Sequence, residues 1–124
     1  DETYWFTAGE GVALLQKLVD HNDPWTVDEF KVVQVRAGDS VYMPAGYGHL
    51  MVNTGSTWLV MVDDSPVAGP DDSASMPGHA EYEPVKALQG FAYYVVEHEG
   101  KPALAKNPKY KEVRTTDFGG LSVI

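Results

Sequence analysis

The chain has 124 residues, 44% of them hydrophobic, with 18 acidic and 9 basic side chains and no cysteine. This length and apolar content suit one domain with one real core. The formal charge of −9 disfavours a nucleic-acid backbone or an anionic membrane as the main partner. No apolar run is long enough to span a bilayer, and no leader has the pattern of a secretory signal.

The lack of cysteine excludes a disulfide framework and thiolate ligands within this sequence. Histidine and carboxylate side chains are therefore the donors left for any metal site. A cysteine-free composition also fits a reducing compartment, and we expect the cytoplasm.

Short runs of β-branched and aromatic residues recur along the chain between Gly, Asn, Asp and Pro, a pattern typical of an all-β sandwich or barrel. A hairpin is predicted at Gly9-Glu10-Gly11 and a turn at 21–24. Composition alone also allows a helix over 12–18, but its place between two turn signals favours a strand. Strands are predicted, in chain order, at 3–7, 12–19, 30–35, 41–43, 49–53, 57–62 and 91–98.

Residues 63–83 are rich in Asp, Ser, Pro and Gly and predict a long acidic loop that carries His79 and Tyr82. A loop of this length inside a compact domain is usually functional or disordered. Residues 84–90 predict a helical turn. The tail, residues 106–124, is predicted to be a C-terminal extension that packs on the surface with its basic residues in solvent.

The most informative motif runs from Gly38 to Asn53. A Gly-Asp turn precedes a short β run that Pro44 ends, and a second bend leads into a strand. His49, Met51 and Asn53 share one face of that strand, and we expect Asn53 to stabilise the turn that follows. By local pattern alone His49 is either a hydrogen-bonded wall residue or a ligand. The whole motif resembles the second signature of the cupin barrel, whose histidine is usually a metal ligand.

From Glu2 to about Tyr110 the chain resembles the cupin-type glucose-6-phosphate isomerases of archaea and some bacteria. The resemblance implies one all-β cupin domain, a double-stranded β-helix of the jelly-roll type that is incomplete at its N-terminus. Residues 1–124 would form its C-terminal two-thirds, and a homodimer is expected. The matching pieces, in family order, are Asp1-Glu2-Thr3-Tyr4, Gly9-Glu10-Gly11, Leu14-Leu15-Gln16, residues 41–55, Gly78-His79, Gln89-Gly90-Phe91 and Asn107-Pro108-Lys109-Tyr110.

In that family a divalent metal is held by a His-x-His pair, a glutamate and the histidine of the second signature. The resemblance assigns the last two ligands to Glu2 and His49. It places the His-x-His pair just upstream of Asp1, so we expect the natural protein to extend further in that direction. The expected metal is Fe, Ni, Mn or Zn, bound with open coordination positions.

Interconverting an aldose and a ketose moves a hydrogen between C1 and C2, which requires a base and stabilisation of charge on the oxygens. By resemblance Glu2 is both ligand and base. Tyr4 lies on the same strand face as Glu2 and is, with His79, a further catalytic candidate. Tyr47 and Tyr82 are the candidates for contacting the sugar phosphate.

One departure from the family pattern bears on the substrate. Asp63 stands where the related enzymes have a phosphate-side tyrosine, and a carboxylate there would repel a phosphate. A different sugar or a sugar acid is therefore an alternative substrate. Two other functions stay open: a metal-dependent cupin oxygenase, which uses the same ligand set, and a non-catalytic sugar-binding cupin.

Overall fold

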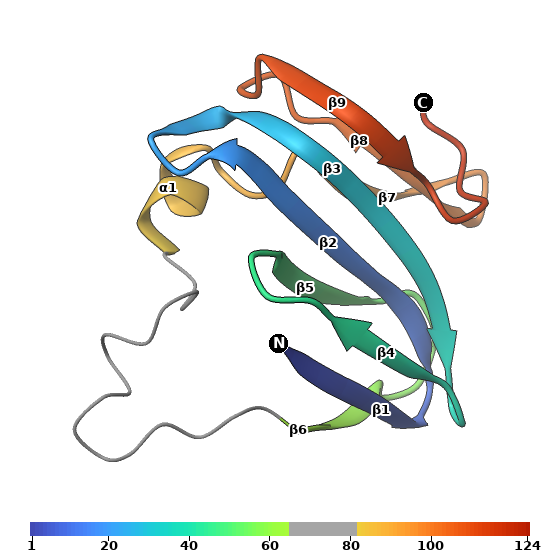
Figure 1. The fold of residues 1–124 in the computed structure, drawn as a ribbon. Helices are drawn as coiled ribbons and strands as arrows, with labels where there is room; N and C mark the ends of the chain where they lie inside the picture. Colours follow the sequence, from blue (N-terminus) through green and yellow to red (C-terminus); the bar gives the residue numbers. More distant parts are fainter. Residues whose placement is uncertain (65–81) are drawn as a thin grey trace.

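The computed structural model describes residues 1–64 and 82–124 and is drawn in Figure 1. Its strands form three sheets with the orders β4-β1-β6, β5-β2-β3-β9 and β7-β8. The predicted all-β, cupin-like class is confirmed, and the sheets do not close on one another. The elements are β1 Glu2–Ala8, β2 Glu10–Asp20, β3 Asp23–Arg36, β4 Ser40–Met43, β5 Gly48–Asn53, β6 Val60–Asp64, α1 Tyr82–Ala87, β7 Tyr93–His98, β8 Lys101–Lys106 and β9 Glu112–Asp117.

The four-stranded sheet lies between the other two sheets and buries a core on each face (Figure 1). Successive side chains of β2 alternate between these cores. Val12 and Leu14 pack in the first core, with α1 and the β7-β8 hairpin. Ala13 and Leu15 pack in the second core, against the β4-β1-β6 sheet. We call the side of the four-stranded sheet that carries Ala13 and Leu15 the inner face.

The motif that ends in β5 folds as predicted. Met51 packs against the second core, whereas Leu50 and Val52 pack against the first. The Asn53 side-chain amide donates to the carbonyl oxygen of Thr57 at 2.8 Å, and its oxygen accepts from the Gly55 amide at 3.0 Å. The predicted role of Asn53 in the following turn is therefore confirmed, and His49 shares the face of Met51.

Several strand bounds differ from the prediction because pairing partners, rather than local composition, set them. The third strand is much longer than predicted, since residues from Asp23 onward pair with β2. The strand predicted at 57–62 lies instead at 60–64, where Asp63 and Asp64 pair with Tyr4 and Thr3 of β1. The strand predicted at 91–98 begins at residue 93.

The C-terminal tail is bound more closely to the domain than its composition indicates. Its residues 112–117 form β9, which pairs in parallel with β3, and Phe118 and Leu121 pack against the first core. The sequence-based prediction also missed strand β8. Strand β9 is poor in apolar residues, since Val113 is its single apolar side chain and its other five residues are exposed. No helix in the two described ranges is long and apolar enough to cross a membrane.

A buried polar network connects the tail to the four-stranded sheet. Gln16 is buried on β2, donates to the hydroxyl of Tyr110 at 3.1 Å and accepts from the amide of Ala92 at 2.9 Å. The Tyr110 hydroxyl in turn donates to the carbonyl oxygen of Gly90 at 2.8 Å. Asn107, which is 1% exposed, donates to two carbonyl oxygens of the same segment. The motif 107–110 is therefore a structural anchor.

This network predicts a specific loss of stability at alkaline pH. Burial raises the pKa of Tyr110 above its ordinary value of 10.0. The folded protein therefore keeps a proton that the unfolded chain loses above about pH 10, so this stabilisation is complete below that pH and is lost as the pH rises through the folded pKa.

The variant Tyr110→Phe removes both this titration and two hydrogen bonds. We expect it to be less stable than the wild type by about 1–2 kcal/mol near neutral pH. The difference should shrink at about pH 11, which urea unfolding at the two pH values measures. A difference that stays constant with pH would contradict the assignment.

Candidate active site

Three of the predicted site residues meet between the two facing sheets. Glu2 and Tyr4 lie on the same face of β1, and His49 lies near the start of β5. The Glu2 Oε1 and His49 Nε2 atoms are 2.9 Å apart, and the Tyr4 hydroxyl is 3.0 Å from the same nitrogen. The rings of Tyr4 and His49 meet edge to face, with centroids 5.3 Å apart.

A single ring nitrogen of His49 thus faces two partners with different demands. If Nε2 carries a proton, it donates to the Glu2 carboxylate; if it carries a lone pair, it accepts from the Tyr4 hydroxyl. One nitrogen cannot serve both partners fully at once. The arrangement can therefore hold a proton, or a cation in its place, between the histidine and the carboxylate.

A second carboxylate lies beside the first. Asp63 of β6 is the cross-strand partner of Tyr4 on β1, so both side chains lie on the same side of that sheet. Burial, a hydrogen bond with Asp63 and the charge of Asp63 raise the pKa of Glu2 above 4.5, while the charge of His49 opposes them. Glu2 is therefore a stronger base than a solvated glutamate.

Tyr4 is held in its neutral form. Burial, followed by the charges of Glu2 and Asp63, raises the pKa of Tyr4 to about 12. Its hydroxyl therefore remains a hydrogen-bond donor across the neutral range. Tyr82 contributes least to this rise, and 77% of this residue is exposed.

The donor atoms of Glu2 and His49 fit a shared metal ion. Two ligands bound at about 2.1 Å and at roughly right angles lie about 3 Å apart, close to the 2.9 Å between Oε1 and Nε2. Their side chains are 18% and 25% exposed, so a small ligand can reach them. Within residues 1–64 and 82–124, no group of three or more His, Asp or Glu side chains could hold a metal by itself.

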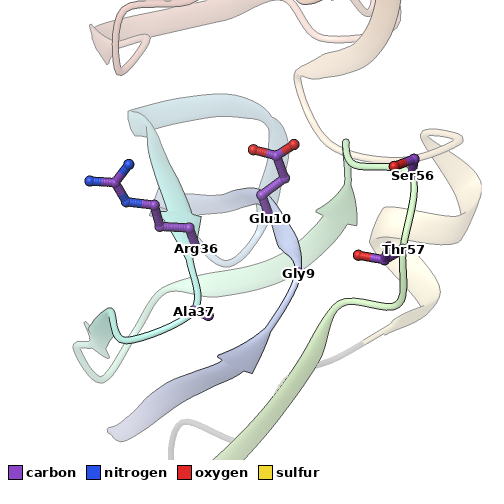
Figure 2. A pocket seen from close by; sticks show the side chains of 6 residues that line it. All are labelled: Gly9, Glu10, Arg36, Ala37, Ser56 and Thr57. Carbon is purple, nitrogen blue, oxygen red and sulfur yellow. The ribbon is translucent and has the colours of Figure 1, made fainter.

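A shallow pocket of about 300 Å³ lies at the opposite end of β1 from Glu2. Figure 2 shows Arg36 on one side, Ser56 and Thr57 on the other and Glu10 between them. Arg36 and Glu10 are cross-strand partners, and the lining has no histidine. This pocket lacks a paired base and histidine. The candidate active site is therefore the contact of Glu2 with His49 between β1 and β5.

A protein family model described as Glucose-6-phosphate isomerase (GPI) matches residues 1–112 of the chain. The chain belongs to the glucose-6-phosphate isomerase family. The match includes Glu2, Tyr4 and His49 as well as the anchor at 107–110. No curated protein matches the chain. Membership in this enzyme family identifies the chain as an isomerase and agrees with the resemblance in the sequence.

The structure describes two of the three remaining site candidates, Tyr47 and Tyr82. Tyr47 packs against the second core and donates from its hydroxyl to Glu29 Oε2 at 3.0 Å. Its pKa is raised by burial and then by Glu29. Tyr82 begins α1. His79 lies outside the described residues, so its predicted role stays a prediction.

Two features of this site were missing from the sequence-based hypothesis. Asp63 was expected in a loop on the phosphate side, but it extends β6 beside Tyr4 and raises the pKa of Glu2. Glu29, the partner of Tyr47, was not a candidate. The alternation of side chains along β3 gives a signal for Glu29, since Val33 and Val35 share its face.

Proposed function

We propose that the chain interconverts glucose 6-phosphate and fructose 6-phosphate, with the reaction centred between β1 and β5. The observation that carries this proposal is the contact of the Glu2 carboxylate with the His49 imidazole at 2.9 Å, within a chain of the glucose-6-phosphate isomerase family. A redox-neutral shift of hydrogen between adjacent carbons needs a base that can return the proton it takes. Glu2, with its raised pKa, is suited to both steps.

The residues around Glu2 have complementary roles in this proposal. Glu2 removes the proton from C2 of the aldose, or from C1 of the ketose, and delivers it to the neighbouring carbon, while the hydroxyl proton passes between O2 and O1 so that the carbonyl and hydroxyl groups exchange places. The neutral hydroxyl of Tyr4 is a donor for the sugar oxygens on which negative charge develops. Asp63 keeps the proton affinity of Glu2 high through its charge. His79, Tyr47 and Tyr82 remain proposed contacts of the substrate.

We further propose that Glu2 and His49 hold a divalent metal, Fe, Ni, Mn or Zn, together with donors outside the described residues. The separation of their donor atoms supports this, as do the carboxylate and imidazole donors themselves. When bound, such an ion supplies Lewis-acid stabilisation of charge on the sugar oxygens. His49 Nε2 would then be occupied by the ion, and the Tyr4 hydroxyl would be free to donate to the substrate.

An activity assay on the natural protein, with and without metal, tests this function directly. After chelation and dialysis, we expect it to convert fructose 6-phosphate at a rate at least about 100-fold below that of protein resupplied with one of the four metals. An enzyme-coupled assay for glucose 6-phosphate measures both rates. Metal-loaded protein that leaves fructose 6-phosphate unchanged would rule out the substrate. Oxygen uptake on adding substrate would instead favour the oxygenase, and metal-free sugar binding would favour a non-catalytic cupin.

A homodimer and a cytoplasmic location complete the proposal. The outer face of the β4-β1-β6 sheet exposes large apolar side chains, namely Trp5 at 42%, Tyr42 at 56% and Val62 at 55%. An apolar sheet face of this kind supports burial against a second copy of the chain. Light scattering that gives the mass of a monomer would contradict the dimer. The lack of cysteine and a phosphorylated substrate agree with the cytoplasm.

A further inference from the structure

The aromatic ring of Phe91 covers Gly48, the residue that precedes His49. A β-carbon added to Gly48 would lie 3.2 Å from Cζ and 3.6 Å from Cε1 of this ring, and carbon atoms in contact are ordinarily about 3.5–4.0 Å apart. The φ angle of Gly48 is not positive, so it is the close approach of the ring that requires glycine here. Phe91 belongs to the first core, and its ring therefore lies on the side of β5 opposite to His49.

Hydrogen bonds on both sides of Phe91 hold the ring in this place. The Phe91 carbonyl oxygen accepts from the side-chain amide of Asn107 at 3.0 Å. The next residue, Ala92, donates its amide to Gln16 Oε1 at 2.9 Å, and its carbonyl oxygen accepts from the Asn107 backbone amide at 2.8 Å. All four residues are buried. Phe91 therefore cannot move away from Gly48 without breaking buried hydrogen bonds, which is costly.

Gln16 connects this buried segment to the strand that carries His49. On β2, Gln16 is the cross-strand partner of Gly48, and its neighbour Leu15 is the partner of His49. The side chain of Gln16 binds the backbone next to Phe91. Gly48 is thus held along one edge by β2 and on one face by the Phe91 ring, and both supports belong to the same hydrogen-bonded network.

Packing, and not a strand pairing, sets the distance between His49 and Glu2. In the part of the chain that the structure describes, β1 pairs with β4 and β6, whereas β5 pairs with β2. His49 is the second residue of β5, which is the end strand of its sheet. A shift at Gly48 therefore carries His49 with it. Displacing a reacting group by about 1 Å can reduce a rate by about 100-fold.

We propose that Phe91 is a positioning residue of the isomerase site: its ring, packed on Gly48, holds the start of β5 where His49 Nε2 meets Glu2 Oε1. The effect of Phe91 on the rate rests on the proposed function, because that function places the reaction at this contact. The effect of Phe91 on the His49 ring requires neither turnover nor a bound metal, so it is measured separately.

The test replaces Phe91 by leucine, which keeps an apolar side chain but removes the ring over Gly48. Nitrogen-15 NMR of the metal-free natural protein, at one fixed alkaline pH, measures the shifts of the two His49 ring nitrogens, which depend on the position of the proton. Contacts with Glu2 and Tyr4 at Nε2 favour one tautomer in the wild type. We expect Phe91→Leu to bring the two shifts closer together, because a displaced ring exchanges its proton between both nitrogens.

The coupled assay gives a second readout for the same variant. We expect Phe91→Leu to lower the kcat for fructose 6-phosphate by about tenfold or more. The KM should stay within about twofold of the wild-type value, because Phe91 lies in the first core and does not contact the substrate.

Phe118→Leu is the matched control, because Phe118 packs against the same core through the rings of Phe30 and Tyr93. It should leave the His49 shifts and the kcat unchanged. Adding Gly48→Ala to Phe91→Leu returns a methyl group to the vacated space and should separate the two shifts again.

Thermal unfolding checks that each variant folds, and Phe91→Met replaces Phe91→Leu if the latter does not. Wild-type His49 shifts in the Phe91 variant, an equal change in Phe118→Leu, or no recovery on adding Gly48→Ala overturns the proposal. A wild type that leaves fructose 6-phosphate unchanged overturns the proposed function instead, and the NMR result stands apart from it.

Discussion

Glu2→Gln is expected to reduce the kcat for fructose 6-phosphate by about 10²–10⁴-fold, the contribution typical of a positioned general base. The substitution keeps the size of the side chain but removes its proton affinity. It also removes a carboxylate oxygen that lies 2.9 Å from His49 Nε2, so metal content should fall with activity. The coupled assay and metal analysis of the same preparation measure both effects.

Stability provides an independent readout for the same variant. Burial and Asp63 raise the pKa of Glu2, which means that the folded state disfavours its charged form. Glu2→Gln should therefore unfold at the same temperature as the wild type or slightly higher, although it loses activity. Glu97→Gln, at an exposed position of β7, is the control and should change neither property. A Glu2→Gln enzyme with wild-type kcat would remove Glu2 from the reaction.

Asn107→Asp is expected to cause the largest loss of stability. The Asn107 side-chain amide donates to the carbonyl oxygens of Leu88 at 2.9 Å and Phe91 at 3.0 Å, and its Oδ1 accepts from the Lys109 amide at 3.0 Å. Aspartate has nearly the same shape but turns a donor into an acceptor. Because residue 107 is only 1% exposed, the new carboxylate oxygen of aspartate would face these two carbonyl oxygens with no water to separate them.

We expect this exchange to reduce the free energy of unfolding by about 3–5 kcal/mol, measured by urea unfolding followed by circular dichroism. Asn53→Asp is the matched control, because Asn53 is exposed at the end of β5 and its side chain donates to one carbonyl oxygen, that of Thr57. Its cost should stay below about 1 kcal/mol. Unfolding of both variants at the same urea concentration would show that the 107–110 motif is not an anchor.

Where one strand face is apolar, the sequence predicts the fold well. The alternation in β2 and β5, and the bend at Pro44, place His49 on the face that carries Met51. The same reasoning puts Tyr4 beside Glu2 on β1. These predictions succeed because burial selects one face of a strand and thereby determines its register.

The parts of the fold that the sequence does not predict depend on pairing with residues distant in the sequence. Strand β9 has little apolar content, and its pairing with β3 is set by residues more than eighty positions away. Asp63 belongs to a strand because Tyr4 is its partner, whereas its acidic neighbours predict a loop.

The central claim is that this isomerase moves a proton through Glu2 at the contact with His49. It is tested most directly by proton NMR of the product formed from fructose 6-phosphate in heavy water. For the metal-loaded wild type, we predict glucose 6-phosphate that carries deuterium at C2 in part of the molecules, because a carboxyl base exchanges its proton with solvent. For Glu2→Gln, we predict almost no product. Product without deuterium from the wild type, or equal rates for the two proteins, would contradict the account.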